Sequence, residues 1–158
     1  MRIRELEEAD LGAVAEIWNP LIRDSAVTFT SDEKTPEALS AWLAAGPPRL
    51  AAEEDGRLLG FACWGAFRGG PGYARIAEHT ILLAGDARGR GVGRALMDAL
   101  GGRARAEGLG SLVGGISGEN APAIAFHAAL GFDEVGRLPR AGWKFGRWMD
   151  LVLMQKLL

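Results

Sequence analysis

The sequence predicts one mixed α/β domain spanning residues 1–158, for three reasons. Some stretches, bounded by glycine, proline and aspartate, have apolar residues that alternate with polar ones or run together, which is typical of strands. Other stretches repeat apolar residues at helical spacing. The two kinds follow in the order β-α-α-β-β-β-α-β-α-β-β without repeats or linkers, in a chain long enough to build its own core.

The elements of the first half each carry a boundary signal. Asp10 is placed to cap the first helix, and Pro36 stands in the first turn of the second, where its missing N–H costs nothing. Asp55-Gly56 between two strand-like runs indicates a tight hairpin turn. The predicted elements are a strand at 2–6, a helix from 11 to a loop at 24–35, a helix from 36 to about 45, and strands at 49–54 and 57–67.

The second half surrounds a glycine-rich loop. Asn120 and Pro122 open its last helix, and Gly131 is suited to a left-handed cap at the end of that helix. The predicted elements are a central strand at 73–84, a helix at 91–107, a strand at 111–117, the helix ending at 131, and strands at 132–138 and 144–157 joined through 139–143.

Composition and charge exclude several classes of protein. The formal net charge of −2 and the scattered Lys and Arg argue against a nucleic-acid binder, which needs a basic surface. No apolar run approaches membrane-spanning length, and the first residues lack the pattern of a signal peptide. The single cysteine, Cys63, excludes an internal disulfide framework and a zinc cluster. We therefore expect a cytoplasmic protein with no metal, no nucleic-acid partner and no membrane partner.

The loop Arg88-Gly89-Arg90-Gly91-Val92-Gly93 joins the predicted central strand to an amphipathic helix. The start of a helix presents unpaired N–H groups and the positive end of a dipole, and glycines let the backbone approach an anion closely. Arg88, Arg90 and Arg94 add positive charge. The loop lacks the third glycine of a dinucleotide fingerprint and the Lys and Ser/Thr of a P-loop. It predicts a different phosphate-binding turn, the alternative being an ordinary glycine-rich turn before a helix.

Three apolar segments contain or form candidate sites. Glu78 lies in the central strand, and its carboxylate has two interpretations. It is either structural, facing outward or paired with Arg75, or a general base whose pKa is raised by the apolar walls around it. His127 shares a helix face with Ala123 and so points inward, either as a satisfied core residue or as a proton donor. Val27–Phe29 is apolar within a polar loop and either packs on the core or forms a pocket wall.

Together these motifs resemble the GNAT acyl-CoA transferases. The loop reads R-x-x-G-x-G, and the last helix matches N-x-x-A-x-x-x-Y-x-x-x-G-F at Asn120, Ala123, Gly131 and Phe132, with His127 in place of the tyrosine. The chain is most similar to the phosphinothricin acetyltransferase-like branch, and the resemblance covers nearly its whole length. The matching segments are Thr28-Phe29, Phe67-Arg68, Tyr73, Glu78-His79, the Arg88–Gly93 loop, Phe126-His127-x-x-Leu130-Gly131-Phe132 and Lys144–Asp150.

This resemblance implies a fold and a reaction. The fold is a mixed, mainly antiparallel sheet flanked by helices, splayed where coenzyme A enters between the strand after Tyr73 and the strand after Ser111. The reaction is direct transfer of acetyl from acetyl-CoA to the primary amine of a small amino-acid-like substrate, of the phosphinothricin or methionine sulfoximine type, in a homodimer. Glu78 is the implied base, and His127 assists departure of the thiolate. The implied cofactor-binding residues are Ile81, Leu82, Leu83, Arg88, Gly89, Arg90, Gly91, Val92, Gly93, Arg94 and Asn120.

The acceptor side departs from that branch at Ala74, Ile76-Ala77 and Leu82. Arg68 or Arg75 is expected to hold a carboxylate through its planar guanidinium, the alternative being that both are solvated. The expected acceptor-binding residues are Phe29, Arg68, Tyr73 and Arg75. Two other functions stay open, an acetyltransferase for protein N-termini or lysines and a non-catalytic acyl-CoA-binding module.

Overall fold

The computed structural model describes residues 1–158 and has the order of strands and helices that the sequence predicts. The elements are β1 (Arg2–Glu5), α1 (Leu11–Asp24), α2 (Pro36–Ala44), β2 (Leu50–Glu54), β3 (Arg57–Ala66), β4 (Ile76–Leu83), α3 (Val92–Ala106), β5 (Ser111–Ser117), α4 (Ala121–Ala129), β6 (Asp133–Lys144) and β7 (Arg147–Leu157). Short 3₁₀ helices occupy Glu8–Asp10, Pro71–Tyr73 and Gly85–Ala87. None of the helices combines the length and the hydropathy that crossing a membrane requires.

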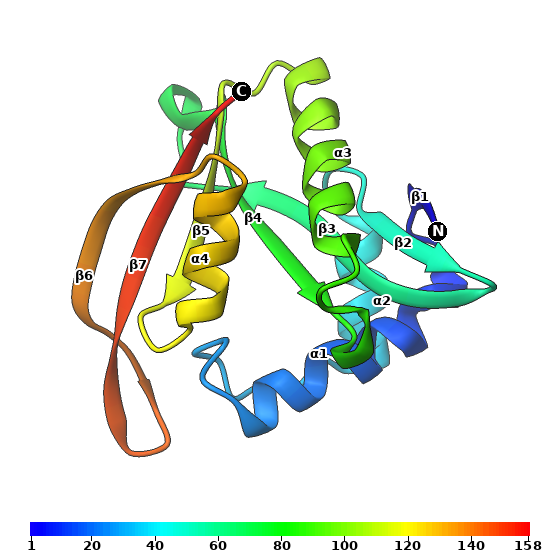
Figure 1. Ribbon diagram of the computed structural model, residues 1–158, viewed down its shortest axis with the longest axis horizontal. Helices are drawn as coiled ribbons and strands as arrows, with labels where there is room; N and C mark the ends of the chain where they lie inside the picture. The colour runs from blue at the N-terminus through cyan, green and yellow to red at the C-terminus, as the bar shows by residue number, and fades with distance from the viewer.

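The seven strands form one sheet in the order β1-β2-β3-β4-β5-β7-β6. Neighbouring strands are antiparallel except β4 and β5, which are parallel. These two pair from Ile76 opposite Ser111 to His79 opposite Gly114, and no further. Beyond this point they diverge, as Figure 1 shows, so one edge of the second half of β4 has no partner strand. The predicted antiparallel character of the sheet and its splay are both confirmed.

Helices cover both faces of the sheet, and each face has its own hydrophobic core. Because successive strand residues point to opposite faces, Ala51 of β2 enters one core while its neighbours Leu50 and Ala52 enter the other. The smaller core lies under α1 and α2 around Phe61. The larger core lies under α3 and α4, which are on the viewer's side in Figure 1.

Two local predictions are wrong. Tyr73 does not begin the central strand, because Pro71–Tyr73 forms a 3₁₀ turn and β4 starts at Ile76. The last hairpin does not turn through 139–143, since β6 continues to Lys144 with register shifts along the way. The turn is made by Phe145 and Gly146, whose φ angles of 55° and 72° are the left-handed values of a tight hairpin.

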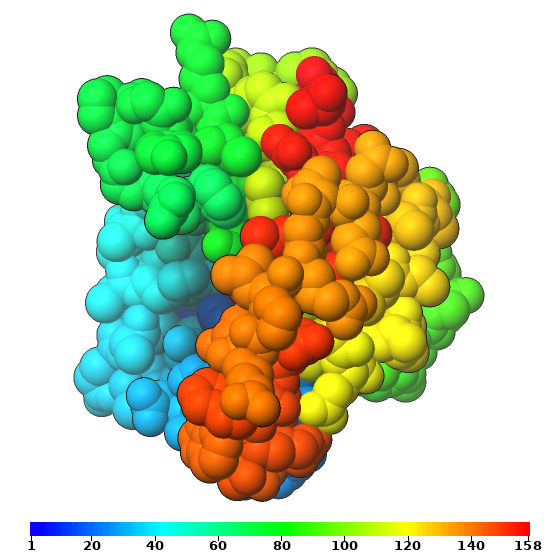
Figure 2. Space-filling model, turned by 90° about the vertical axis from the view of Figure 1, so that its left-hand side faces the viewer, coloured from blue at the N-terminus to red at the C-terminus, as the bar shows by residue number.

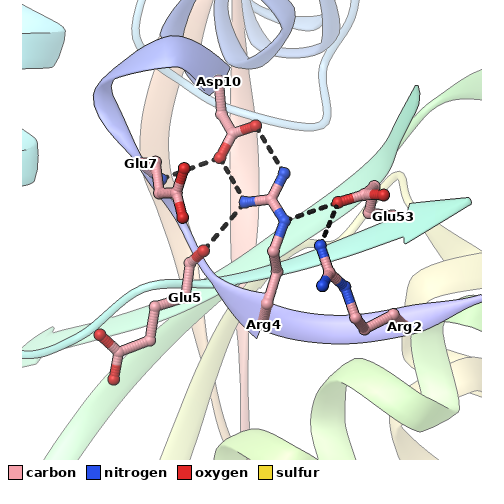
Figure 3. Close-up of polar contacts among 6 residues, drawn as sticks. All are labelled: Arg2, Arg4, Glu5, Glu7, Asp10 and Glu53. Atoms are coloured by element: carbon pink, nitrogen blue, oxygen red, sulfur yellow. Dashed lines mark hydrogen bonds and ion pairs between the residues drawn. The ribbon is translucent and has the colours of Figure 1, made fainter. Parts of the chain in front are cut away.

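The predicted helix cap at Asp10 is also wrong, and Arg4 is the reason (Figure 3). A 3₁₀ turn precedes α1, so Asp10 already has helical backbone angles and its side chain does not cap α1. Its carboxylate accepts two hydrogen bonds from the Arg4 guanidinium, at 2.6 and 2.8 Å, and one from the N–H of Glu7. Arg4 also donates to Glu53 of β2, at 2.7 Å, which Arg2 contacts as well. Arg4 thereby ties β1 to β2 and to the start of α1.

Replacing Arg4 with Met should lower the melting temperature at neutral pH by roughly 3–10 °C, since hydrogen bonds to charged groups are worth about 1.5–3 kcal/mol. The matched control is Arg2→Met, whose side chain is 68% exposed and contacts Glu53 alone, and which should have a smaller effect.

Acid should remove this difference between Arg4→Met and wild type. Hydrogen bonds from Arg4 hold the pKa of Asp10 below its ordinary value and lower that of Glu53 from 4.5 to about 2. A carboxylate whose pKa is lower in the folded than in the unfolded protein stabilises the fold at pH values above its unfolded pKa. This contribution is lost as the pH falls toward the folded pKa. Thermal melts between pH 7 and pH 2 test this. A difference that persists unchanged below pH 3 would contradict the ionic role of Arg4.

Candidate active site

The divergence of β4 and β5 opens a cavity of about 390 Å³. The two strands form its sides from their last paired residues onward, and α1 and the loop after it close a third side. Helix α4, the residues just before it and Leu151 of β7 complete the lining. The lining residues are Trp18, Val27, Thr28, Phe29, Glu78, His79, Thr80, Ile81, Leu82, Gly114, Gly115, Ile116, Ser117, Asn120, Ala123, His127 and Leu151.

Glu78 contributes the one acidic side chain of this lining. Ala77 belongs to the core under α3, so the alternation of β4 places Glu78 on the opposite face, toward α1. Its carboxylate lies over Gly115, where an added Cβ would stand 2.8 Å from Oε1. Glu78 is open to solvent on one side, and the protein atoms around its carboxylate raise its pKa above the ordinary value by partial desolvation, with no charged neighbour contributing. A carboxylate in this state, at the wall of a cavity, can accept a proton from an amine.

The loop Val27–Phe29 forms a wall of the cavity, which was one of the two alternatives for this apolar segment. The ring of Phe29 packs against Gly142 of β6, where an added Cβ would overlap the ring. Buried Lys144 donates to the carbonyl oxygens of Ser25 and Thr28 at 2.7 and 2.8 Å, and burial lowers its pKa. Figure 2 shows the orange β6–β7 hairpin beside the blue N-terminal part of the chain. The hairpin therefore fixes this wall.

The glycine-rich loop leads into α3 as the sequence predicts. Gly89 and Gly91 have positive φ angles of 73° and 80°, and α3 begins at Val92 with no side chain capping it. The first N–H groups of α3 are consequently open to a ligand. Gly93 has a different role, since an added Cβ would lie 3.0 Å from the ring of Phe126. The absence of a Cβ at position 93 lets α3 and α4 approach each other.

The three arginines of this loop have separate surroundings. Arg90 forms an ion pair with Glu54 of β2, and Arg94 donates to the carbonyl oxygen of Ala129 at 3.2 Å. Arg88 lines a second cavity, of about 540 Å³, between α1 and the end of β4. Asn120 lines the first cavity and caps α4, because its side-chain oxygen accepts a hydrogen bond from the N–H of Ala123.

The expected acceptor-binding residues do not all meet at the cavity. Phe29 lines it, but Arg68, Tyr73 and Arg75 are exposed outside its lining. The Arg68 guanidinium lies 5.9 Å from the centre of the Tyr73 ring. The carbonyl of Arg75 accepts a hydrogen bond from Gly110. The segment before β4 projects from the surface as the green part at the upper left of Figure 2.

His127 is buried and reaches the cavity from α4. Its Nδ1 lies 2.8 Å from the carbonyl oxygen of Ala123, and its Nε2 lies 2.9 Å from Nε2 of His79, which is buried as well. Burial lowers the pKa of both rings. The role of His79 was not anticipated from the sequence, in which it stands beside the more conspicuous Glu78.

This architecture and site define an acyltransferase of the acetyl-CoA-dependent type. Residues 14–132 match the Acetyltransferase (GNAT) family, which is more than half of the chain. The chain belongs to the GNAT family, and it is an acetyl-CoA-dependent N-acetyltransferase.

Curated relatives are similar over almost the whole chain. L-amino acid N-acyltransferase MnaT of Escherichia coli is 35% identical over 98% of this chain and 92% of that protein. An L-methionine sulfoximine/L-methionine sulfone acetyltransferase of Pseudomonas paraeruginosa is 35% identical over 97% of this chain and 92% of its own. Phosphinothricin N-acetyltransferase of Alcaligenes faecalis is 35% identical over 98% of this chain and 81% of its own. The resemblance to the phosphinothricin acetyltransferase-like branch is confirmed.

Solved structures superpose closely. A Salmonella typhimurium acetyltransferase with its cofactor acetyl-CoA has a TM-score of 0.95 and 35% identity, covering 100% of this chain and 94% of that one. A ribosomal-protein-alanine N-acetyltransferase from Brucella melitensis has a TM-score of 0.95 and 38% identity, covering 100% of both chains.

Replacing Lys144 with Met should loosen the cavity wall formed by the loop after α1. The two hydrogen bonds from Nζ to this loop would be lost, so the amides at 26–30 should exchange hydrogen faster while β5 stays protected. Hydrogen exchange followed by mass spectrometry measures this. Lys156→Met is the matched control, because Lys156 also donates to a carbonyl, that of Leu130, but away from this loop. Equal exchange of 26–30 in both variants would contradict the anchoring role of Lys144.

Proposed function

We propose that this enzyme transfers the acetyl group of acetyl-CoA directly to the primary α-amine of a small amino-acid-like substrate, of the phosphinothricin or methionine sulfoximine type. The observation that carries the proposal is Glu78, an unpaired carboxylate of raised pKa in the cavity between the diverging strands. The names of the relatives, which describe acetylation of amino acids of this kind, support the acceptor class.

Glu78 removes the proton that blocks the amine. An amine with a pKa of about 8–10 is mostly protonated at neutral pH and has no lone pair for attack. Glu78 takes this proton, directly or through a water, and the nitrogen then bonds to the acetyl carbon. The carbon–sulfur bond breaks, and coenzyme A leaves as a thiolate that takes up a proton. No bond between enzyme and acetyl group is formed at any stage.

Coenzyme A occupies the opening between the strands in this proposal. Pantetheine pairs with the backbone of Ile81, Leu82 and Leu83, on the edge of β4 that lacks a strand partner. A backbone N–H of β4 polarises the thioester carbonyl. The pyrophosphate lies on the first N–H groups of α3, held by the loop from Arg88 to Arg94, and Asn120 contacts pantetheine from α4.

His127 assists departure of the thiolate in this scheme. It stands on the cofactor side of the cavity, but both of its ring nitrogens are engaged within the protein. Direct donation from Nε2 therefore requires that the contact with His79 opens and that Nε2 gains a proton. For this reason we expect His127→Phe to be milder than a change at Glu78, with water protonating the thiolate.

Phe29 encloses the side chain of the acceptor in this proposal, and Arg68 or Arg75 holds its carboxylate. Both arginines flank the turn that leads into β4, and Tyr73 lies beneath Arg68. Both arginines are exposed. The variants Arg68→Ala and Arg75→Ala measure the carboxylate contact through kcat/KM.

The α-amine of a protein N-terminus is a second candidate acceptor. The Brucella melitensis structure, named for ribosomal-protein alanine, supports it through its 38% identity. A peptide and a free amino acid present the same amine, and they differ in the carboxylate next to it.

Assembly, location and metal content are further parts of the proposal. We place the enzyme in the cytoplasm, in keeping with its single, buried, unpaired cysteine. A homodimer is supported by the apolar residues that the β6–β7 hairpin exposes, among them Trp143, Phe145 and Trp148. The reaction as written uses neither a metal nor a nucleic acid.

Replacing Gly91 with Val should abolish stabilisation of the protein by coenzyme A. A β-branched residue is strained at φ 80°, so the start of α3 would be reshaped and its N–H groups turned away. The measurement is the shift in melting temperature on adding coenzyme A, taken relative to each variant without ligand. Gly102→Ala, in an open position of α3, is the control. A normal ligand shift in Gly91→Val would place the phosphates elsewhere.

Replacing Glu78 with Gln should lower kcat by about 10²–10⁴-fold, the usual contribution of a general base, while coenzyme A affinity stays as in wild type. Raising the pH should partly rescue the variant, because more of the amine is then unprotonated. Wild-type turnover at pH 7 in this variant would assign the base to another group.

The acceptor class is tested by thiol release from acetyl-CoA against a matched panel. The panel contains phosphinothricin, methionine sulfoximine, the decarboxylated amine of each, and a peptide that begins with alanine. Release with the acids alone supports the proposal. Equal release with the decarboxylated amines refutes the carboxylate contact, and release with the peptide alone favours the second candidate. Release with none refutes the acceptor class.

A further inference from the structure

His79 and His127 are the two histidines of the chain, and they form one buried pair. Their side chains come from β4 and α4, and the Nε2 atoms lie 2.9 Å apart. Each residue is at most 5% exposed. A buried contact between two polar rings needs a hydrogen to lie between them, because two facing lone pairs would repel each other.

The position of that hydrogen follows from the neighbouring atoms. The carbonyl oxygen of Ala123 can only accept, so Nδ1 of His127, at 2.8 Å, must carry a hydrogen. In a neutral His127 ring, Nε2 then carries a lone pair and no hydrogen. The hydrogen between the rings therefore belongs to Nε2 of His79. The remaining nitrogen, Nδ1 of His79, is an acceptor, and it is buried without a hydrogen-bond partner. The reverse arrangement would set the lone pair of His127 Nδ1 against the carbonyl oxygen.

The surroundings of the pair are mainly apolar. The rings of Phe126 and Phe132 lie 5.2 Å from that of His127, and Phe132 is also 5.2 Å from His79. Gly114 faces the pair from β5. Of the ionisable groups on the neighbouring elements, Lys156 lies beyond Phe132, at 5.9 Å from its ring, and Glu78 leaves β4 on the opposite face. Burial is the largest influence and lowers the pKa of both histidines, and a charge on His127 lowers the pKa of His79 further. The backbone of Val113 beside His79 and that of Ala123 beside His127 act in the opposite direction, but they do not outweigh burial.

The pair lies where β4 and β5 separate. His79 opposite Gly114 is the last paired position, and a Cβ at 114 would be 3.0 Å from Cε1 of His79 and 3.3 Å from Nε2 of His127. The glycine therefore admits both rings. Helix α4 carries Asn120 and Ala123, which line the cavity, and the histidine contact is its polar bond to β4 at this point.

We propose that His79 is a positioning residue for acetyl transfer: the hydrogen on its Nε2, donated to Nε2 of His127, keeps the His127 ring neutral and oriented and holds helix α4 on strand β4 where the sheet divides. Its effect on catalysis rests on the proposed function, whereas its effect on His127 does not. Removing the donor frees the lone pair of His127, so that ring should become easier to protonate and free to rotate. The cavity wall that α4 supplies should shift with it.

The two histidines allow a direct test by nitrogen-15 spectroscopy of histidine-labelled protein. Wild type at pH 7 should show two neutral rings of opposite tautomer, one protonated on Nδ1 and one on Nε2. His79→Gln leaves the His127 ring alone in the spectrum and assigns it to the Nδ1–H form. Two Nε2–H rings, or an imidazolium at pH 7, would overturn the assignment and the proposal with it.

The variants then separate positioning from packing. His79→Leu removes the donor, so the pKa of His127 should rise toward its ordinary value of about 6.5. Although Nε2 of His127 is then free to take up a proton, the displaced ring and the shifted α4 wall should lower kcat about 10-fold or more, while KM for the acceptor changes little. His79→Gln supplies an amide N–H near the position of Nε2 and should restore both. Phe132→Leu, which removes packing against both rings without a polar contact, should lower the melting temperature and leave the titration of His127 unchanged.

Each result decides the proposal. A titration of His127 that is the same in His79→Leu and wild type, or a Gln variant as impaired as the Leu variant, overturns it. If His79→Leu does not fold, the tautomers of wild type and the comparison of His79→Gln with Phe132→Leu decide. Failure of every acceptor in the thiol-release panel refutes the proposed function, while the spectra still test the pair.

Discussion

The close approach of β5 to two neighbouring residues of β4 is the constraint on which the site depends. Gly114 and Gly115 occupy the position where parallel pairing ends. A side chain at 114 would collide with the histidines on one face, and a side chain at 115 would collide with the carboxylate of Glu78 on the other. Glycine inside a strand costs stability, and its presence commonly marks such a close approach. In this sheet, the cost in stability falls at the point where β4 and β5 diverge.

Because side chains alternate between the two faces of a strand, the adjacent residues Glu78 and His79 of β4 have different surroundings. Glu78 faces α1 and the wall that contains Phe29, whereas His79 faces α4 and its histidine. In the proposed reaction, the carboxylate that takes the proton of the amine and the histidine beside the thiol therefore lie on opposite faces of the sheet. A shift of register by one residue would exchange the two faces, so the pairing of β4 with β3 and β5 determines the chemistry as well as the fold.

Features set by local chemistry could be predicted from the sequence. Thr35 with Pro36, Asp55-Gly56, and Asn120 with Pro122 mark boundaries that depend on a few neighbouring residues, and the structure has them there. Glu78 was a candidate because a charge in an apolar strand is conspicuous, and it lines the cavity. Asp10 was misassigned because its partner, Arg4, lies in another element and competes with the helix for its carboxylate. Phe145-Gly146 was missed as a turn because Pro139 and Gly142 resemble stronger turn signals.

The other residues of the site could be recognised only from the folded structure. Lys144 and Gly142 are ordinary strand residues until the loop after α1 is seen against them, and no spacing in the sequence connects them to Ser25 or Phe29. His79 is similar, since its partner is 48 residues away. The exposure of Arg68 and Arg75 also depends on how the segment before β4 leaves the sheet, which composition does not fix.

The bonds from Lys144 to Ser25 and Thr28 span 119 and 116 residues, nearly the length of the chain. Contacts of such separation are costly to close and form late, and a chain made on the ribosome folds from its N-terminus first. Glu78 can take its place in β4 before β6 exists, but the wall opposite it has no anchor until residue 144 has emerged. The anchored wall is therefore a property of the finished chain, acquired after the strand that carries Glu78.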